Sequence, residues 1–255
     1  MKNVLAVYAL WHREILRFSR QRNRLFGAMG QPLLFWIFFG SGFSGSFRPQ
    51  GGALSYPQFF YPGILLMVIL FTALFANFSL IEDRKEGFLQ GAWVSPVARW
   101  TLVFGKVLGA ATLALFQAAL FLGLAPFVSI SLSTGVILKV CLALACVAIA
   151  LSALGFALAW KMDSIQGFHA IMMLLFLPMW FLSGAFFPIE NVPAWMRMLI
   201  QVNPLTYALS WIKHSLWGEA AVSWASALPM APSVGWSLFF MSMAFFIAVR
   251  RAKKY

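Results

Sequence analysis

The sequence predicts an all-α integral membrane protein with six transmembrane helices. Hydrophobic residues make up 62% of the 255 residues, whereas Asp and Glu together number only 7. Soluble domains contain about 45–50% apolar residues, and a water-exposed surface would need more charge than this chain carries. Its apolar runs also reach the roughly 20 residues that a helix needs to cross a bilayer. Lipid is therefore the expected solvent.

The predicted spans follow one another without a soluble domain between them. They cover residues 25–43, 59–81, 100–128, 135–160, 168–187 and 228–249. The third exceeds the required length, so we expect it to extend beyond the membrane at the end that carries Lys106. Pro229 and Pro232 interrupt the start of the sixth. Residues 1–255 are predicted to form one membrane domain.

The positive charges set the predicted orientation. With a cytoplasmic N-terminus, fifteen of the nineteen Lys and Arg residues fall on the cytoplasmic side. The exceptions are Arg48, Lys139, Arg197 and Lys213. Because positive residues accumulate on the cytoplasmic side of membranes, both termini are expected inside. The net charge of +12 is explained in this way, so nucleic acid is not an expected partner.

Residues 1–24 predict an interfacial helix. Val4, Val7, Tyr8, Trp11, Ile15 and Phe18 form one stripe at helical spacing, and Lys2, Arg13, Arg17 and Arg20 lie opposite. Such a helix is expected to lie in the plane of an anionic membrane surface. A basic target helix for a soluble partner is the alternative.

Residues 188–227 are too interrupted for an ordinary span, because Pro193, Asn203-Pro204 and Glu219 break an otherwise apolar stretch. Two short re-entrant helices are the favoured interpretation, since irregular backbone is tolerated at membrane depth when it packs against protein. An external loop with one amphipathic helix is the alternative.

Catalytic signatures are missing from the sequence. His12, His169 and His214 are scattered, no metal-binding motif is present, and Gly105-Lys106 lacks the upstream glycines of a phosphate-binding loop. Lys106 and Lys139 lie near span ends, where lysine side chains snorkel to the interface. Without a carboxylate at a span centre, an ion-driven carrier is disfavoured. A membrane enzyme is a minor alternative.

The segment 82–99 combines five consecutive charges, from Glu82 to Glu86, with a short apolar piece. Gly87 is suited to end the preceding helix, and Ser95-Pro96 is suited to begin the next. Between them, Phe88, Leu89, Ala92 and Trp93 share one side of a short helix. The residues leave two interpretations open, which are a connector resting on lipid and a helix that docks into a soluble partner.

Two motifs resemble a known family. "EGFLQGAWVSPVARWTLVFGKVLGAA" (86–111) and "FLSGAFFPIENVPAWMRMLIQVNPLTYAL" (181–209) are similar to hallmark segments of ABC-2 type transporter permeases of the drug-resistance and nodulation-export kind. The similarity extends over nearly the whole chain. It implies a transmembrane subunit with six helices that is driven by two copies of a separate ATPase subunit and pairs with a second permease, as a homodimer or a heterodimer.

The resemblance also implies roles for particular residues. The family's coupling helix follows helix two, which assigns contact with the ATPase to Arg84, Lys85, Glu86, Gly87, Phe88 and Leu89. In relatives the pathway forms at the subunit interface, mainly from helices one, two and five. By position this implies a lining of Phe35, Phe38, Phe39, Phe176, Trp180 and Phe181, for which ordinary packing or lipid contact is the alternative.

The resemblance finally implies export across a bacterial cytoplasmic (inner) membrane. An amphipathic or lipid-linked substrate, such as a drug-like molecule, a lipid or a glycan, fits the aromatic and nearly uncharged spans. No cofactor is expected in this chain, because ATP and Mg²⁺ would be bound by the partner ATPase. A membrane scaffold or assembly protein that binds a soluble partner without transport is the alternative from another class.

Overall fold

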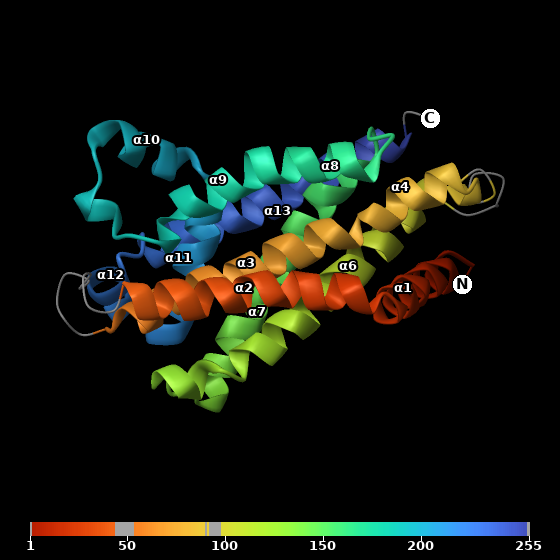
Figure 1. Ribbon diagram of the computed structural model, residues 1–255. Coiled ribbons are helices and arrows are strands. Elements are labelled where there is room, and N and C mark those ends of the chain that lie inside the picture. The colour runs from red at the N-terminus through yellow and green to blue at the C-terminus, as the bar shows by residue number, and fades with distance from the viewer. Residues whose placement is uncertain (1, 44–53, 90, 92–97, 254–255) are drawn as a thin grey trace.

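The computed structural model describes residues 2–43, 54–89, 91 and 98–253, and all the regular secondary structure within these ranges is helical. The elements are α1 (Lys2–Arg20), α2 (Arg22–Gly42), α3 (Tyr56–Ala76), α4 (Phe78–Lys85), α6 (Arg99–Leu122), η1 (Ala125–Val128), α7 (Thr134–Ala159), α8 (Ile165–Ile171), η2 (Met172–Phe176), α9 (Leu177–Trp180), η3 (Phe181–Ala185), η4 (Ile189–Asn191), α10 (Ala194–Val202), α11 (Pro204–Trp217), α12 (Ala220–Ala225) and α13 (Met230–Lys253). The long helices run side by side along one direction (Figure 1).

Helix α3 is the centre of the bundle. Every residue from 59 to 74 is buried, and α3 contacts α2, α6, α7 and α11. A helix that is hydrophobic on all sides belongs in a core, which explains why this stretch has no polar face. Helix α4 continues α3 past Asn77, and together they form one 30-residue candidate membrane span, Tyr56–Lys85.

Five helices in the described part of the chain are long and apolar enough to cross a membrane. They correspond to the predicted second to sixth spans, with bounds of Tyr56–Lys85, Arg99–Leu122, Thr134–Ala159, Ile165–Ala185 and Met230–Ala252. Helix α2, the predicted first span, is not among them, although it packs along α3 (Figure 1). The membrane character of this protein is therefore clear, whereas the first predicted span, and with it the total of six, remains a prediction.

The two ends of the bundle differ in composition. The start of α1, the end of α13 and the charged run of α4 lie at one end, here called the charged end, and α10, α11 and α12 lie at the other (Figure 1). This common placement is what an even number of spans requires. Which end faces the cytoplasm remains a prediction from the positive charges.

The fifth predicted span is an interrupted helix. The wider π-helical turns η2 and η3 alternate with α8 and α9, and Pro178 lies in the short α9. Proline removes a backbone donor and widens a helix in this way. The helix ends at Gly184, whose φ of +82° is a conformation that glycine adopts without a steric cost.

Residues 188–227 form short helices, as the predicted pair of re-entrant helices requires. Helices α10 and α11 meet at Asn203, whose side chain accepts a hydrogen bond from the Leu205 amide (3.0 Å) and donates one to the Met179 carbonyl (2.6 Å). Helix α11 packs against α7, α13 and η3. Its depth in the membrane, and hence its re-entrant character, remains a prediction.

Helix α1 packs lengthwise against α6. Leu10 lies against Gly105 and Glu14 against Gly109, so α1 runs alongside the first half of α6 in the same direction. Its orientation relative to the membrane plane stays a prediction. The predicted stripe is divided, with Phe18 buried while Val4 and Tyr8 are 70% and 60% exposed.

Candidate functional site

The charged end contains a cluster of buried ionic side chains from three helices. Asp83 of α4 is fully buried, and its carboxylate accepts hydrogen bonds from Arg13 (2.7 and 2.9 Å) and Arg17 (2.6 Å) of α1. Lys106 of α6 pairs with the same carboxylate and lies 2.7 Å from Glu14. These five residues, Arg13, Glu14, Arg17, Asp83 and Lys106, are called the ionic cluster below.

The cluster is internally satisfied. Ser79 donates a hydrogen bond to Glu14 (2.5 Å) and accepts one from Lys106 (3.2 Å). The hydrogen bond with Asp83 raises the pKa of the Arg13 guanidinium above its ordinary value, because it stabilises the charged form. Buried charges persist when they are paired and hydrogen-bonded in this manner. The cluster therefore fixes α1, α4 and α6 relative to one another.

Two glycines of α6 allow this contact. A Cβ atom at Gly105 would lie 2.6 Å from the Leu10 Cβ, and one at Gly109 would lie 2.7 Å from the Glu14 Cβ. Their spacing of four residues places both on one face of α6, where small residues let helix backbones approach closely. Lys106, between them, consequently reaches Glu14 without leaving the protein interior.

The predicted coupling residues divide into anchored and exposed positions. Arg84 bonds to the backbone carbonyls of Trp160 and Met162, and so ties α4 to the turn between α7 and α8. Phe88 lies beneath Arg13, with 3.9 Å between the guanidinium carbon and the ring centroid, and Leu89 is buried. Lys85 and Glu86 are exposed. Only these last two present charged groups to a partner among the predicted residues.

Gly87 confirms the predicted end of the helix. Helix α4 ends at Lys85, and Gly87 has a φ of +76°, which is the left-handed conformation that follows many helix C-termini. Gln90 and residues 92–97 lie outside the described residues, and this range includes most of the predicted docking helix and the Ser95-Pro96 cap. Helix α6 begins at Arg99.

The ionic cluster was missed by the sequence analysis. Lys106 was expected to snorkel, but it is 2% exposed and paired, so that expectation was wrong. Arg13 and Arg17 were assigned to a membrane-facing basic surface, yet both turn to Asp83. The available signals were Glu14, an acidic residue within a basic helix, and the Gly105-x-x-x-Gly109 spacing.

The predicted pathway residues have mixed positions within this single chain. Phe35, Phe39, Trp180 and Phe181 belong to one group of contacting aromatic rings that also includes Phe60 and Phe186. Trp180 is fully buried and its indole donates a hydrogen bond to the Gly63 carbonyl (2.7 Å). Phe176 is also buried, whereas Phe38 is 66% exposed.

A second buried lysine lies at the opposite end. Lys213 of α11 is 1% exposed, and its ammonium donates hydrogen bonds to the carbonyls of Gly184 (3.0 Å) and Ala225 (2.7 Å). The same nitrogen lies 4.8 Å from the centre of the Phe59 ring. Lys213 thereby joins the ends of η3 and α12 to α3. The sequence placed this lysine in an external segment without a role.

Apolar candidate spans surround a buried helix, and the ion pairs among the described residues lie at the charged end. This arrangement defines a polytopic helical membrane protein. The chain belongs to the ABC-2 type transporter family, whose model matches residues 6–217. It is 31% identical over 225 residues to "Putative transport permease ycf38" of Cyanophora paradoxa, an alignment that covers 83% of this chain and 75% of the relative.

Two bacterial relatives carry related names. The chain is 25% identical to "Inner membrane transport permease YadH" of Escherichia coli K12, with 84% of each chain covered. It is 23% identical to "Daunorubicin resistance ABC transporter permease protein DrrB1" of Streptomyces coeruleorubidus, with 89% of this chain and 79% of the relative covered. This protein is thus an ABC-2 type membrane transport protein, and its family is one of permease subunits rather than catalytic domains.

Proposed function

We propose that this chain is the transmembrane permease subunit of an ATP-driven exporter in a bacterial cytoplasmic membrane. In this proposal two chains pair, and two copies of a separate ATPase subunit bind at the charged end and supply ATP and Mg²⁺. The cargo is an amphipathic or lipid-linked molecule, which suits spans rich in aromatic residues. The family membership and the names of the relatives support this class of function.

The position of Asp83 supports the charged end as the coupling site. Asp83 lies two residues before the exposed Lys85, and its carboxylate is held by α1 and α6 at the same time. A force on the loop after α4 would therefore reach α1 through the contacts of Asp83 with Arg13 and Arg17. It would reach α6 through the ion pair of Asp83 with Lys106. Rigid ionic contacts between elements transmit displacement in this way.

Charge reversal at the exposed positions tests the coupling contact. We expect Lys85→Glu and Glu86→Lys to lower ATP hydrolysis by the reconstituted complex severalfold, because like charges would face one another across the contact. Lys139→Glu is the matched control, since Lys139 is equally exposed but lies at the start of α7, away from the charged end. If both variants stimulated the ATPase as much as the wild type does, the assignment of Lys85 and Glu86 to the coupling contact would be wrong.

Transport itself needs a separate measurement. Inverted membrane vesicles containing the chain and its ATPase should accumulate a fluorescent amphipathic lipid only when ATP is supplied. A scaffold protein would instead bind the ATPase without ATP-dependent uptake of any amphipathic probe. That result, together with normal ATPase binding, would replace the exporter proposal by the scaffold alternative.

A further inference from the structure

His214 lies in the last turn of α11, next to Lys213, and is 3% exposed. Both of its ring nitrogens face backbone carbonyls. Nδ1 lies 3.0 Å from the Gly218 oxygen, and Nε2 lies 2.8 Å from the Leu228 oxygen. Gly218 directly follows α11, and Leu228 lies in the connection between α12 and α13. The imidazole therefore joins the end of α11 to the segment that enters the last candidate span.

The two contacts of His214 require two donors on one ring. A carbonyl oxygen only accepts hydrogen bonds, and a neutral imidazole has one N–H, whereas the imidazolium has two. In a neutral ring, the lone pair of the other nitrogen would face a carbonyl oxygen at 3.0 Å or less. Both contacts are therefore satisfied only when both nitrogens carry a proton.

Lys213 does not depend on its proton in this way. Burial lowers the pKa of Lys213 to about 7, and the charge of Glu190 in η4 acts in the opposite direction. A neutral amine still has two N–H groups, which is the number that the Gly184 and Ala225 carbonyls need. Lys213 thus keeps its contacts when it loses a proton, whereas His214 loses one of two.

Carboxylates do not pair with His214 in the described part of the chain. Its ion pairs all involve other residues, and Glu219, just after Gly218, is exposed. A buried charge is tolerated only when it is hydrogen-bonded, so the two carbonyls are what supports the charged ring. The other titratable side chains that the helices in contact with α11 contribute outside the charged end are Tyr56 and Tyr61 of α3, Lys139, Cys141 and Cys146 of α7, and Arg197 of α10.

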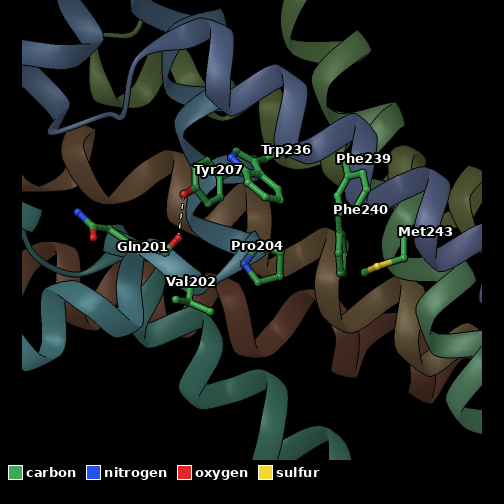
Figure 2. Close-up of a pocket in the computed structure, with 8 residues that line it drawn as sticks. All are labelled: Gln201, Val202, Pro204, Tyr207, Trp236, Phe239, Phe240 and Met243. Carbon is green, nitrogen blue, oxygen red and sulfur yellow. Dashed lines mark hydrogen bonds between the residues drawn. The ribbon is translucent and has the colours of Figure 1, made fainter.

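The connection that His214 holds lies where α11 packs against the start of α13. The Tyr207 ring of α11 lies 5.9 Å from the Trp236 ring of α13, as Figure 2 shows. The Ser210 hydroxyl of α11 accepts a hydrogen bond from the Leu228 amide (3.1 Å). His214 and Ser210 therefore hold both backbone groups of Leu228, and only the contact with His214 depends on a titratable group.

We propose that His214 is a proton-dependent latch between α11 and the start of α13. The doubly protonated ring bonds the Gly218 and Leu228 carbonyls together, and the ring that has lost a proton keeps one of them. The latch is complete at acid pH and is lost as the pH rises through the range of about 5 to 8, in which imidazole side chains change charge. This inference is independent of ATP-driven transport.

The protonation state is measured directly on a chain with one histidine. His12→Gln combined with His169→Gln leaves His214 as the only one of the 3 histidines. The full-length protein, purified in detergent with a histidine-free tag, is labelled with ¹⁵N-histidine for NMR. We expect two protonated ring nitrogens at pH 5.5 and one at pH 8. The same number of protonated nitrogens at both pH values would overturn the proposal.

The contribution of the latch to stability is measured with His214→Gln, whose side chain has one nitrogen and so cannot replace both ring donors. We expect the wild-type Tm to exceed that of His214→Gln by about 2–4 °C more at pH 5.5 than at pH 8, as the loss of one hydrogen bond predicts. Titration of Lys213 is common to both chains and cancels. His169→Gln, at an exposed position, should respond to pH as the wild type does. A Tm difference that is equal at both pH values, or larger at pH 8, would show that His214 is not a latch.

Discussion

The two ends of this protein each bury a lysine, with different partners. At the charged end, Lys106 is 2% exposed and its partners are the carboxylates of Glu14 and Asp83, from two other helices. At the opposite end, Lys213 is 1% exposed and its partners are two backbone carbonyls and the Phe59 ring. The first lysine is paired with two carboxylates, and the second is held by carbonyl oxygens and an aromatic ring.

This difference suggests different tasks. An ion pair between separate helices fixes their positions strongly and leaves a bare buried charge when one partner moves away. Carbonyl groups at the C-terminal ends of helices have no partner within the helix. Lys213 supplies a hydrogen-bond donor to such carbonyls of η3 and α12 and so holds these two helix ends together. We therefore expect the charged end to transmit motion and the opposite end to hold its short helices in place.

Asp83→Ala should lower stability more than any other variant proposed below. It removes the carboxylate that Arg13, Arg17 and Lys106 share. Lys106 would keep Glu14 and Arg17 would keep Glu82, but the three cations would lose their common partner. The free energy of unfolding should therefore fall by about 3 kcal/mol, measured by denaturation in detergent. Asp163→Ala is the control, because Asp163 lies 3.8 Å from Arg84 but is 96% exposed, and it should cost at most about 1 kcal/mol. Equal losses in the two variants would contradict the importance of burial.

Lys213→Met should have the second-largest effect. Methionine keeps the apolar stem but leaves the Gly184 and Ala225 carbonyls without this donor, which should cost about 1.5–3 kcal/mol. Limited proteolysis should then cut α10 to α12 faster than the charged end. Lys139→Met, at an exposed position, should change stability by less than about 0.5 kcal/mol. Equally faster proteolysis at both ends would contradict a local role for Lys213.

Gly109→Ala should have a smaller effect, confined to the contact of α1 with α6. The added Cβ would meet the Glu14 Cβ at 2.7 Å, and the resulting overpacking should lower stability by about 1–2 kcal/mol. Gly235→Ala in α13 has no atom within 4 Å of the added Cβ and should raise stability by up to about 1 kcal/mol. The two glycine variants should thus differ in sign in the same denaturation assay.

Phe88→Leu should have the smallest effect. It removes the ring beneath Arg13 while keeping an apolar side chain, so only the cation–π interaction of about 0.5–1 kcal/mol is lost. Phe88→Trp should retain or strengthen that interaction. If leucine and tryptophan gave identical stabilities, Arg13 would be held by Asp83 alone.

Several features of the fold were predictable because they depend on local patterns. Apolar length identified the second to sixth spans, and the five that meet the length and composition requirement lie where they were predicted. Gly87 marked the end of α4 because only a residue without a side chain adopts its positive φ readily. The family was recognisable from the two hallmark segments, and its match to residues 6–217 confirms that prediction.

The partners of the charged residues were not predictable in the same way. A helical wheel assigned Arg13 and Arg17 to a membrane surface, because it describes α1 without its neighbours. Asp83 and Lys106 are separated by 23 residues in the sequence, and no periodicity indicates that they meet. For the same reason the six coupling residues appeared equivalent, although Leu89 is buried and Lys85 is exposed.

The sequence by itself determined that this chain is a helical membrane protein of the ABC-2 type, because length, apolarity and motif spacing are properties of the chain alone. Only the tertiary structure decided which charges pair, that α1 runs alongside the first half of α6, and that Lys213 bonds the carbonyls at the ends of η3 and α12. Charge pairing depends on distances between helices, and those distances are set by close packing at positions such as Gly105 and Gly109.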